Sequence, residues 1–250
     1  MTGRRRFTIT GEGRHDDQVT FDREESHHLG HVLRLKPGDT VIAVDGSGRE
    51  LTVRLDAVTP TASGTVVGVA APDTESPFAI TLVQAIPKGD KLEAVIRAAT
   101  ELGATRIAPA LTARTVVRLE PARLAPRRAR WERVAREAAK QSGRSRLPVI
   151  EAPRPLAEWI GEPAAMDVAR VCLWEGERVS LAGALRRLPA TPTAAVVIVG
   201  PEGGLTEDEV HDARSAGWLI AGFGPRLLRT ETAGPAVIAA LQLLFGDLGR

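Results

Sequence analysis

Two segments near the end of the chain restrict its fold most strongly, because each joins a short apolar run to a turn rich in glycine and proline. The first runs from Val196 to Thr206 and contains the turn Gly200-Pro201-Glu202-Gly203-Gly204. The second runs from Phe223 to Ala233 and contains Arg226-Leu227-Leu228-Arg229-Thr230-Glu231-Thr232. A strand, a turn and a helix in this order predict an α/β domain with a mostly parallel sheet. Loops at the carboxyl ends of such strands can together form one pocket.

The first 72 residues have a different pattern, made of short strands and glycine turns. Thr40–Val44 is apolar and ends in Asp45-Gly46-Ser47-Gly48, which is typical of a hairpin turn. Leu51–Leu55 alternates apolar and polar residues, as a half-buried strand does. Several short strands of this kind predict a small β-barrel.

A polar segment bounded by proline, residues 73–77, is the predicted linker. After it, strands alternate with helices. Asp90-Lys91-Leu92-Glu93 and Thr206-Glu207-Asp208-Glu209 each predict a capping box at the start of a helix. The predicted domains are therefore a β-barrel over residues 1–72 and an α/β domain over residues 78–250.

Composition excludes several classes of protein. The chain has 250 residues and one cysteine, Cys172, so an intrachain disulfide is impossible and a reducing compartment is expected. No run approaches the roughly 20 apolar residues of a membrane-spanning helix, and no secretory signal is recognisable. His27 and His28 have no cysteine or carboxylate partner at ligand spacing, so no metal is expected. We therefore expect a cytoplasmic protein that does not associate with membranes.

Positive charge is concentrated in the middle of the chain, although the net charge is only +2. Between Arg114 and Arg146 there are eleven basic and three acidic residues. Arginine binds phosphates through its forked guanidinium and stacks on bases, so the stretch indicates contact with nucleic acid. The alternative is a solvated helix face, because Trp131, Val134 and Ala138 form an apolar stripe at helical spacing.

The turn at Gly200–Gly204 leaves a strand and precedes a capped helix, which is where open α/β sheets bind ligands. It lacks the Lys-Ser/Thr ending of a P-loop and the Gly-x-Gly-x-x-Gly pattern of dinucleotide folds. Glu202 would repel a phosphate but tolerate a sulfonium cation. A purely structural tight turn is the alternative for this segment taken alone.

The second segment has a structural interpretation as well. Thr230 or Thr232 is predicted to cap the last helix, with Glu231 in its first turn. Arg226 and Arg229 are not explained in this way, because positive charge is unfavourable at a helix start. Residues that break a local rule are candidates for function.

The two segments, together with others along the chain, occur in the same order as the motifs of one known protein family. Both terminal motifs are similar to those of the RsmE family, the ribosomal RNA (uridine-N3)-methyltransferases of the SPOUT superfamily. Further segments resemble it too: Arg4-Arg5-Arg6-Phe7, His27-His28-Leu29, Val32–Asp39, Lys88–Lys91, Thr100–Ala104, Ala113–Val117 and Glu137–Arg144. Gly30-His31 stands where the family more often has an arginine, and Gly234-Pro235 interrupts its usual helix start.

The resemblance implies a fold and a cofactor. It implies an N-terminal PUA-like β-barrel that helps bind RNA, a SPOUT methyltransferase domain with a C-terminal trefoil knot, and a homodimer. It implies S-adenosylmethionine, bound among three loops. The implied cofactor-binding residues are Leu173, Trp174, Glu175, Val199, Gly200, Pro201, Glu202, Gly203, Gly204, Phe223, Gly224, Leu227, Leu228 and Thr230.

The resemblance also implies a reaction, methyl transfer to N3 of one uridine of 16S ribosomal RNA in the small ribosomal subunit. We hypothesise that Arg229, with Arg226, stabilises charge on a uracil carbonyl, and that Glu231 is either the base or a helix cap. The candidate RNA contacts are Arg4, Arg5, Arg6, Arg34, Lys88, Arg114 and Arg144. The alternatives are a non-catalytic RNA-binding ribosome-assembly factor and a SPOUT methyltransferase that acts on transfer RNA.

Overall fold

The computed structural model describes residues 6–9, 13–116 and 121–249. It divides the chain into two compact units. The first comprises Met1–Glu75 and Arg136–Leu147, and the second comprises Ser76–Ala135 and Pro148–Arg250. The predicted linker at 73–77 and the domain limits drawn from it remain a prediction.

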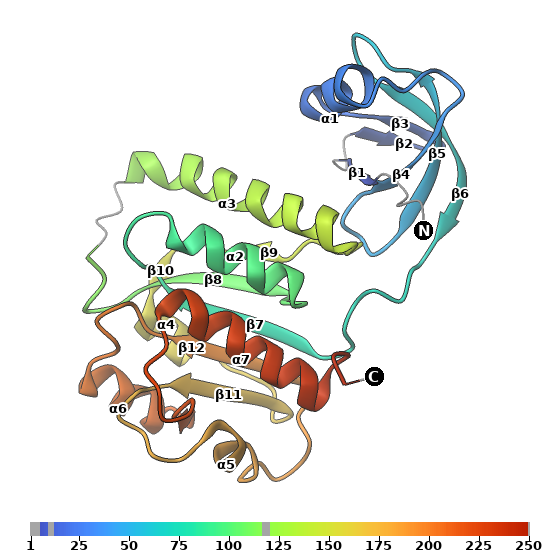
Figure 1. Cartoon of the computed structure of the whole chain (residues 1–250). Coiled ribbons are helices and arrows are strands. Elements are labelled where there is room, and N and C mark those ends of the chain that lie inside the picture. The colour runs from blue at the N-terminus through green and yellow to red at the C-terminus, as the bar shows by residue number, and fades with distance from the viewer. Residues whose placement is uncertain (1–5, 10–12, 117–120, 250) are drawn as a thin grey trace. The chain divides into compact units, whose positions relative to one another are not determined.

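The first unit is built on a six-stranded, largely antiparallel sheet with the strand order β1-β4-β5-β6-β3-β2 (Figure 1). Its strands are β1 (Arg6–Thr8), β2 (Arg14–His15), β3 (Gln18–Thr20), β4 (Thr40–Val44), β5 (Glu50–Ala57) and β6 (Ser63–Ala70). The hairpin predicted between Thr40–Val44 and Leu51–Leu55 is confirmed, because β4 and β5 pair antiparallel. Helix α1 (Arg23–His27) continues into a π-helical turn, His28–Val32.

Two buried ion pairs stabilise the first unit. Glu25 is 4% exposed, and its carboxylate accepts hydrogen bonds from the backbone and hydroxyl of Thr8 and from Lys140 Nζ, at 2.9–3.0 Å. Arg144 is also 4% exposed, and its guanidinium binds Glu75 Oε2 at 2.8 Å. Removing one partner of such a pair leaves an uncompensated charge in the core, which is strongly unfavourable.

The second unit is an α/β domain, as the two terminal motifs predicted. Its seven strands all pair in parallel, in the order β10-β8-β7-β12-β11-β13, with β9 beside β8. The strands are β7 (Ala79–Ala85), β8 (Arg106–Leu111), β9 (Val149–Ile150), β10 (Arg154–Pro155), β11 (Val168–Leu173), β12 (Ala194–Val199) and β13 (Leu219–Ala221). The helices are α2 (Lys91–Glu101), α3 (Pro121–Ser142, which continues into the first unit), α4 (Leu156–Gly161), α5 (Leu181–Leu185), α6 (Glu207–Ser215) and α7 (Thr230–Phe245).

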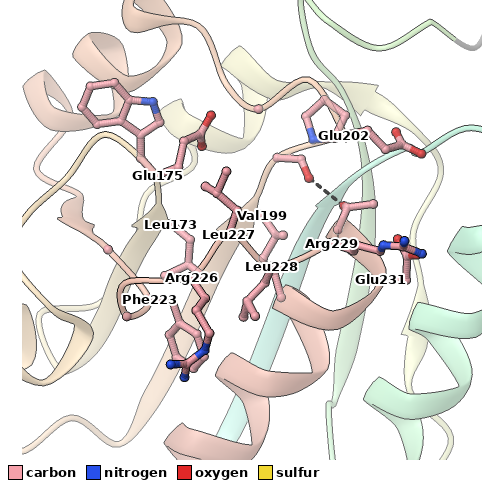
Figure 2. A pocket seen from close by; sticks show the side chains of 18 of the residues that line it. Leu173, Glu175, Val199, Glu202, Phe223, Arg226, Leu227, Leu228, Arg229 and Glu231 are labelled. Atoms are coloured by element: carbon pink, nitrogen blue, oxygen red, sulfur yellow. Dashed lines mark hydrogen bonds between the residues drawn. The ribbon is translucent and has the colours of Figure 1, made fainter.

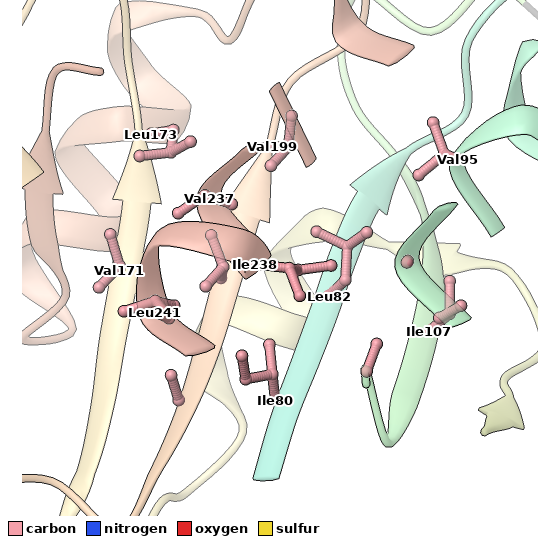
Figure 3. Packing of buried hydrophobic residues seen from close by; sticks show 14 of the residues in the cluster. Ile80, Leu82, Val95, Ile107, Val171, Leu173, Val199, Val237, Ile238 and Leu241 are labelled. Atoms are coloured by element: carbon pink, nitrogen blue, oxygen red, sulfur yellow. The ribbon is translucent and has the colours of Figure 1, made fainter. Parts of the chain in front are cut away.

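Alternation along the strands sends side chains into two separate cores. Val171 and Leu173 of β11 lie in the core under α2 and α7, whereas Cys172 between them lies in the core under α4 and α6. Figure 3 shows Val237 and Ile238 of α7 packed over the same face of the sheet. Because both faces are covered, the exposed part of the central strands is their ends. Within the described residues, no helix has the length and hydropathy to cross a membrane.

Candidate active site

A pocket of about 610 Å³ lies at the carboxyl ends of the central parallel strands. Strand pairing sets Val199 beside Gln84 and Leu173 beside Ala221, so the loops that follow these strands leave the same edge of the sheet. The pocket is lined by these loops, by the start of α7 and by Lys91 at the start of α2. A crevice in this position is where open α/β sheets bind ligands.

Almost every residue predicted for the cofactor loops lines this pocket (Figure 2). The lining includes Leu173, Trp174, Glu175, Val199, Gly200, Pro201, Glu202, Gly204, Phe223, Gly224, Leu227, Leu228 and Thr230, together with Arg226, Arg229 and Glu231. Gly203 is outside the lining: its carbonyl oxygen accepts a 2.6 Å hydrogen bond from Arg114 Nη1. Sequence reasoning missed Lys91, Gly222, Pro225 and Ala233.

A chain of buried hydrogen bonds joins the strand, loop and helix that meet at the pocket. Gln84 Nε2 donates to Thr230 Oγ1 at 2.9 Å, and Thr230 Oγ1 donates to the Gly200 carbonyl at 2.8 Å. Figure 2 marks the second of these bonds. The predicted capping role of Thr230 is therefore wrong, because its hydroxyl is used by Gly200. Helix α7 begins at Thr230, and the N-cap position is Arg229, without a side-chain cap.

An ion pair connects the start of α2 with the loop after β12. Lys91 Nζ lies 2.9 Å from Glu202 Oε1, and the same carboxylate accepts the backbone N–H of Lys88 at 3.1 Å. Burial acts to raise the pKa of Glu202, but the hydrogen bonds, that from Lys91 foremost, lower it below the ordinary value. The hydrogen bond to Glu202 also raises the pKa of Lys91. Both groups are therefore charged, and Lys91 partly neutralises the loop.

Two glycines of the pocket have a conformation that other residues rarely adopt. Gly204 has a φ of +70° and Gly224 a φ of +81°. A Cβ atom at Gly204 would also collide with the carboxylate of Glu175. Gly204 therefore allows the loop after β12 to turn tightly beside the first loop.

Arg226 and Arg229 lie on different sides of the pocket. In Figure 2, Arg226 extends near Phe223, whereas Arg229 extends toward the side of Glu231. The two arginines therefore cannot be treated as one interchangeable pair.

Glu231 Oε2 lies 3.8 Å from Lys91 Nζ. This oxygen is buried and has no hydrogen-bond partner among the described residues.

The predicted RNA contacts are dispersed. Arg4 and Arg5 lie outside the described residues. Arg34, Lys88 and Arg114 are exposed, and Arg34 has the unusual φ of +52°.

The remaining two predicted contacts are engaged within the first unit. Arg6 binds the Gly143 carbonyl at 2.5 Å and forms an ion pair with Glu50. Arg144 is buried against Glu75. The position of Arg144 favours a structural role, so we do not retain it as an RNA contact. Along the described ranges, no group of three or more His, Cys, Asp or Glu residues is arranged to hold a metal ion.

Comparison with known proteins agrees with this geometry. A family model described as an RNA methyltransferase domain matches residues 74–242, and one described as an RNA methyltransferase PUA domain matches residues 21–60. The protein named ribosomal RNA small subunit methyltransferase E of Bacillus subtilis (strain 168) is 34% identical over 250 residues, which cover 96% of this chain and 93% of that protein. Its namesake in Synechocystis is 32% identical over 96% of this chain and 78% of its own.

A crystal structure is similar over nearly the whole length. It is that of a ribosomal RNA small subunit methyltransferase E from Neisseria gonorrhoeae bound to S-adenosyl methionine. The two chains share 32% identity with a TM-score of 0.87, over 98% of this chain and 99% of that one. The α/β domain and the N-terminal PUA-type domain expected from the sequence are thereby confirmed.

Proposed function

This chain belongs to the RNA methyltransferase family whose members include ribosomal RNA small subunit methyltransferase E, and we propose that it methylates N3 of one uridine in 16S ribosomal RNA with S-adenosylmethionine as the donor. The family and the relatives named above support methylation of small-subunit ribosomal RNA. The observation that carries the proposal is the pocket at the sheet edge, which brings the three predicted loops together with Arg229 and Glu231.

The pocket suits S-adenosylmethionine in size and in chemistry. About 610 Å³ is within the usual range for a small-molecule site. Leu173, Val199 and Phe223 provide apolar lining of the kind an adenine ring requires, and Gly204 and Gly224 allow the backbone to approach a ligand closely. When bound, the cofactor supplies an electrophilic methyl group on a sulfonium sulfur.

The residues of this chain have to activate the base. N3 of uracil carries a proton and is a poor nucleophile until that proton leaves. The Glu231 carboxylate accepts the proton, because it lines the pocket and its Oε2 has no hydrogen-bond partner among the described residues. Arg229 stabilises the negative charge that develops on a uracil carbonyl. Arg226 is the second candidate for this role, and it lies on the other side of the pocket.

RNA binding is mainly electrostatic in this proposal. Arg34, Lys88 and Arg114 contact phosphates, together with Arg4 and Arg5. The substrate is the assembled small subunit, and the enzyme is a cytoplasmic homodimer with the trefoil knot of the SPOUT fold. These finer features come from the family resemblance described above.

The experiment that tests the proposal is methyl transfer from labelled S-adenosylmethionine to small ribosomal subunits that lack their own N3-methyluridine. The product nucleoside is identified by mass spectrometry after digestion. We expect label in N3-methyluridine at a single site. Label in another nucleoside, or in transfer RNA offered in parallel, would contradict the proposed specificity, and absence of cofactor binding would favour a non-catalytic assembly factor.

A further inference from the structure

Lys91 is a cationic residue in the lining of the pocket, and the proposed function does not use it. Its side chain is 41% exposed, and its ammonium lies between two carboxylates, 2.9 Å from Glu202 Oε1 and 3.8 Å from Glu231 Oε2. An ammonium group carries three hydrogens, so the bond to Glu202 leaves donors available on the pocket side. Lys91 is therefore anchored in position while it can still bind a ligand.

Arg229 extends toward the same side of the pocket. Its positive charge is close enough to lower the pKa of Lys91, whereas the hydrogen bond to Glu202 raises that pKa. Within the described residues, its guanidinium has neither a hydrogen bond nor an ion pair. Glu231 Oε2 is likewise an acceptor without a hydrogen bond in the part of the chain that the structure describes. The start of α7 and the start of α2 thus place two cationic donors and one carboxylate in the lining of the same pocket.

We propose that Lys91, Glu231 and Arg229 together recognise the pairing edge of uracil as a donor–acceptor–donor set. That edge consists of the O4 acceptor, the N3–H donor and the O2 acceptor, which is the complementary pattern. One uracil carbonyl binds Lys91, the other binds Arg229, and N3–H donates to Glu231. This assignment rests on the proposed function, because uracil is the base which that function names.

The set distinguishes uracil from other bases. Cytosine presents an amino group and an unprotonated N3, so a cation would face a donor and the Glu231 carboxylate would face a lone pair. Guanine presents its N2 amino group to one of the two cations. Unpaired polar groups of this kind in a closed site reject the wrong substrate strongly. Lys91 would therefore act in both specificity and catalysis.

The same three residues account for the proton and the charge in the methyl transfer. The bond between N3 and the methyl carbon forms while the bond between that carbon and the sulfonium sulfur breaks, with its electron pair remaining on sulfur. The N3 proton passes to the Glu231 carboxylate. Lys91 and Arg229 stabilise the charge that the two carbonyl oxygens acquire as the proton leaves.

The first test compares Lys91→Met, Lys91→Arg and Glu202→Gln with the unchanged chain. We measure the single-turnover rate constant on small ribosomal subunits at saturating S-adenosylmethionine, and the Kd of the cofactor by calorimetry without RNA. Lys91→Met should slow methyl transfer about 100-fold, as loss of one donor to a developing oxyanion does. The cofactor Kd should stay within about twofold, and Lys91→Arg should recover much of the rate because it restores a donor.

Glu202→Gln is the matched control, because it removes the negative charge beside Lys91 but retains the ammonium of Lys91. Its rate loss should be at least about tenfold smaller than that of Lys91→Met. Equal losses in the two variants, or a weaker cofactor affinity in Lys91→Met that accounts for its slower rate, would show that Lys91 only holds the loop. An unchanged rate in Lys91→Met would overturn the assignment of Lys91 but not the proposed function. A product of the unchanged chain other than N3-methyluridine would overturn both.

The second test uses pH. Glu231→Gln removes the base, so its defect should shrink as the pH rises, since uracil then loses its N3 proton without help. The defect of Lys91→Met should persist over the same range, because a carbonyl still lacks its donor. A Glu231→Gln defect that is independent of pH would contradict the role of Glu231 as the acceptor of the proton.

Discussion

The two units of this protein use charged side chains in opposite ways. In the first unit, Glu25 and Arg144 are buried and saturated with partners, and neither is available to a ligand. In the second, Lys91, Arg229 and Glu231 gather at the open end of a sheet and are only partly satisfied. The same residue types therefore stabilise the fold in one place and remain available for chemistry in the other.

The difference follows from what surrounds each group. Glu25 lies inside the sheet unit, where an unpaired charge is strongly unfavourable, so its partners must be complete. The strand ends of a parallel sheet are the part that helices leave uncovered, so charges there can be incompletely paired at low cost. Charged side chains that line a pocket and lack a full set of partners thus indicate a candidate site, whereas fully paired buried charges indicate a structural ion pair.

The largest effect on stability is expected for Lys140→Met. It leaves the Glu25 carboxylate buried without its cation, and such losses cost about 3–5 kcal/mol. We would measure the free energy of unfolding in urea by circular dichroism. The matched control is Arg128→Met, which breaks an exposed pair with Glu132 and should leave the midpoint almost unchanged. Similar losses in the two variants would remove the distinction between buried and exposed pairs.

The next largest effect concerns Arg229→Ala in the second unit. Its turnover should fall about 10²- to 10³-fold while the urea midpoint stays near that of the unchanged chain, because the side chain stabilises charge in the reaction and not the fold. Arg226→Ala is the matched variant, and its loss should be smaller because it extends toward the other side of the pocket. A larger loss for Arg226→Ala would reverse the two roles.

A smaller effect is expected for Thr230→Val, which keeps the shape of the side chain. It removes the donor to the Gly200 carbonyl and leaves Gln84 Nε2 without this acceptor, so the second and third loops separate more easily. Cofactor affinity should weaken by about tenfold, in line with the loss of a buried hydrogen bond. Thr232→Val is the control, since Thr232 is exposed two positions later. Calorimetry that gave the same Kd for both variants would contradict this connection.

The smallest effect concerns Cys172, which directly precedes the first pocket residue. Burial raises the pKa of its thiol to about 12, so almost no thiolate exists at pH 8. A disulfide reagent such as DTNB should not label the native protein at pH 8, but should label it rapidly in guanidinium. Rapid labelling of the native protein would mean that β11 opens beside the pocket.

The sequence was informative where partners are near in the chain. The capping box at Thr206 is confirmed, because Thr206 and Glu209 satisfy each other within one turn. Asp90 is the N-cap residue of α2, as predicted, but its side chain makes no capping hydrogen bond, and Glu93 binds Arg130 of α3 instead. A helix cap made by residues of the same turn can be predicted from the sequence. A cap whose residues bind distant partners instead cannot.

The same limit applied to the site. The strand–turn motifs predicted loops that line one pocket in the structure, since strand ends determine where loops emerge. Lys91 was missed because its partners, Glu202 and Glu231, are more than a hundred positions away. The burial of Arg144 could not be predicted for the same reason, because its partner Glu75 is distant in sequence. A signal for Lys91 did exist, since the Lys88–Lys91 segment follows the end of a buried strand.

The central claim is that three loops at one edge of the second unit form the S-adenosylmethionine site. Hydrogen–deuterium exchange with and without the cofactor tests it most directly, because it maps the bound loops without requiring the RNA. We expect slower exchange at residues 173–175, 199–204 and 223–230, and little change in the strands of the first unit. Protection confined to other segments, or none at saturating cofactor, would contradict the account.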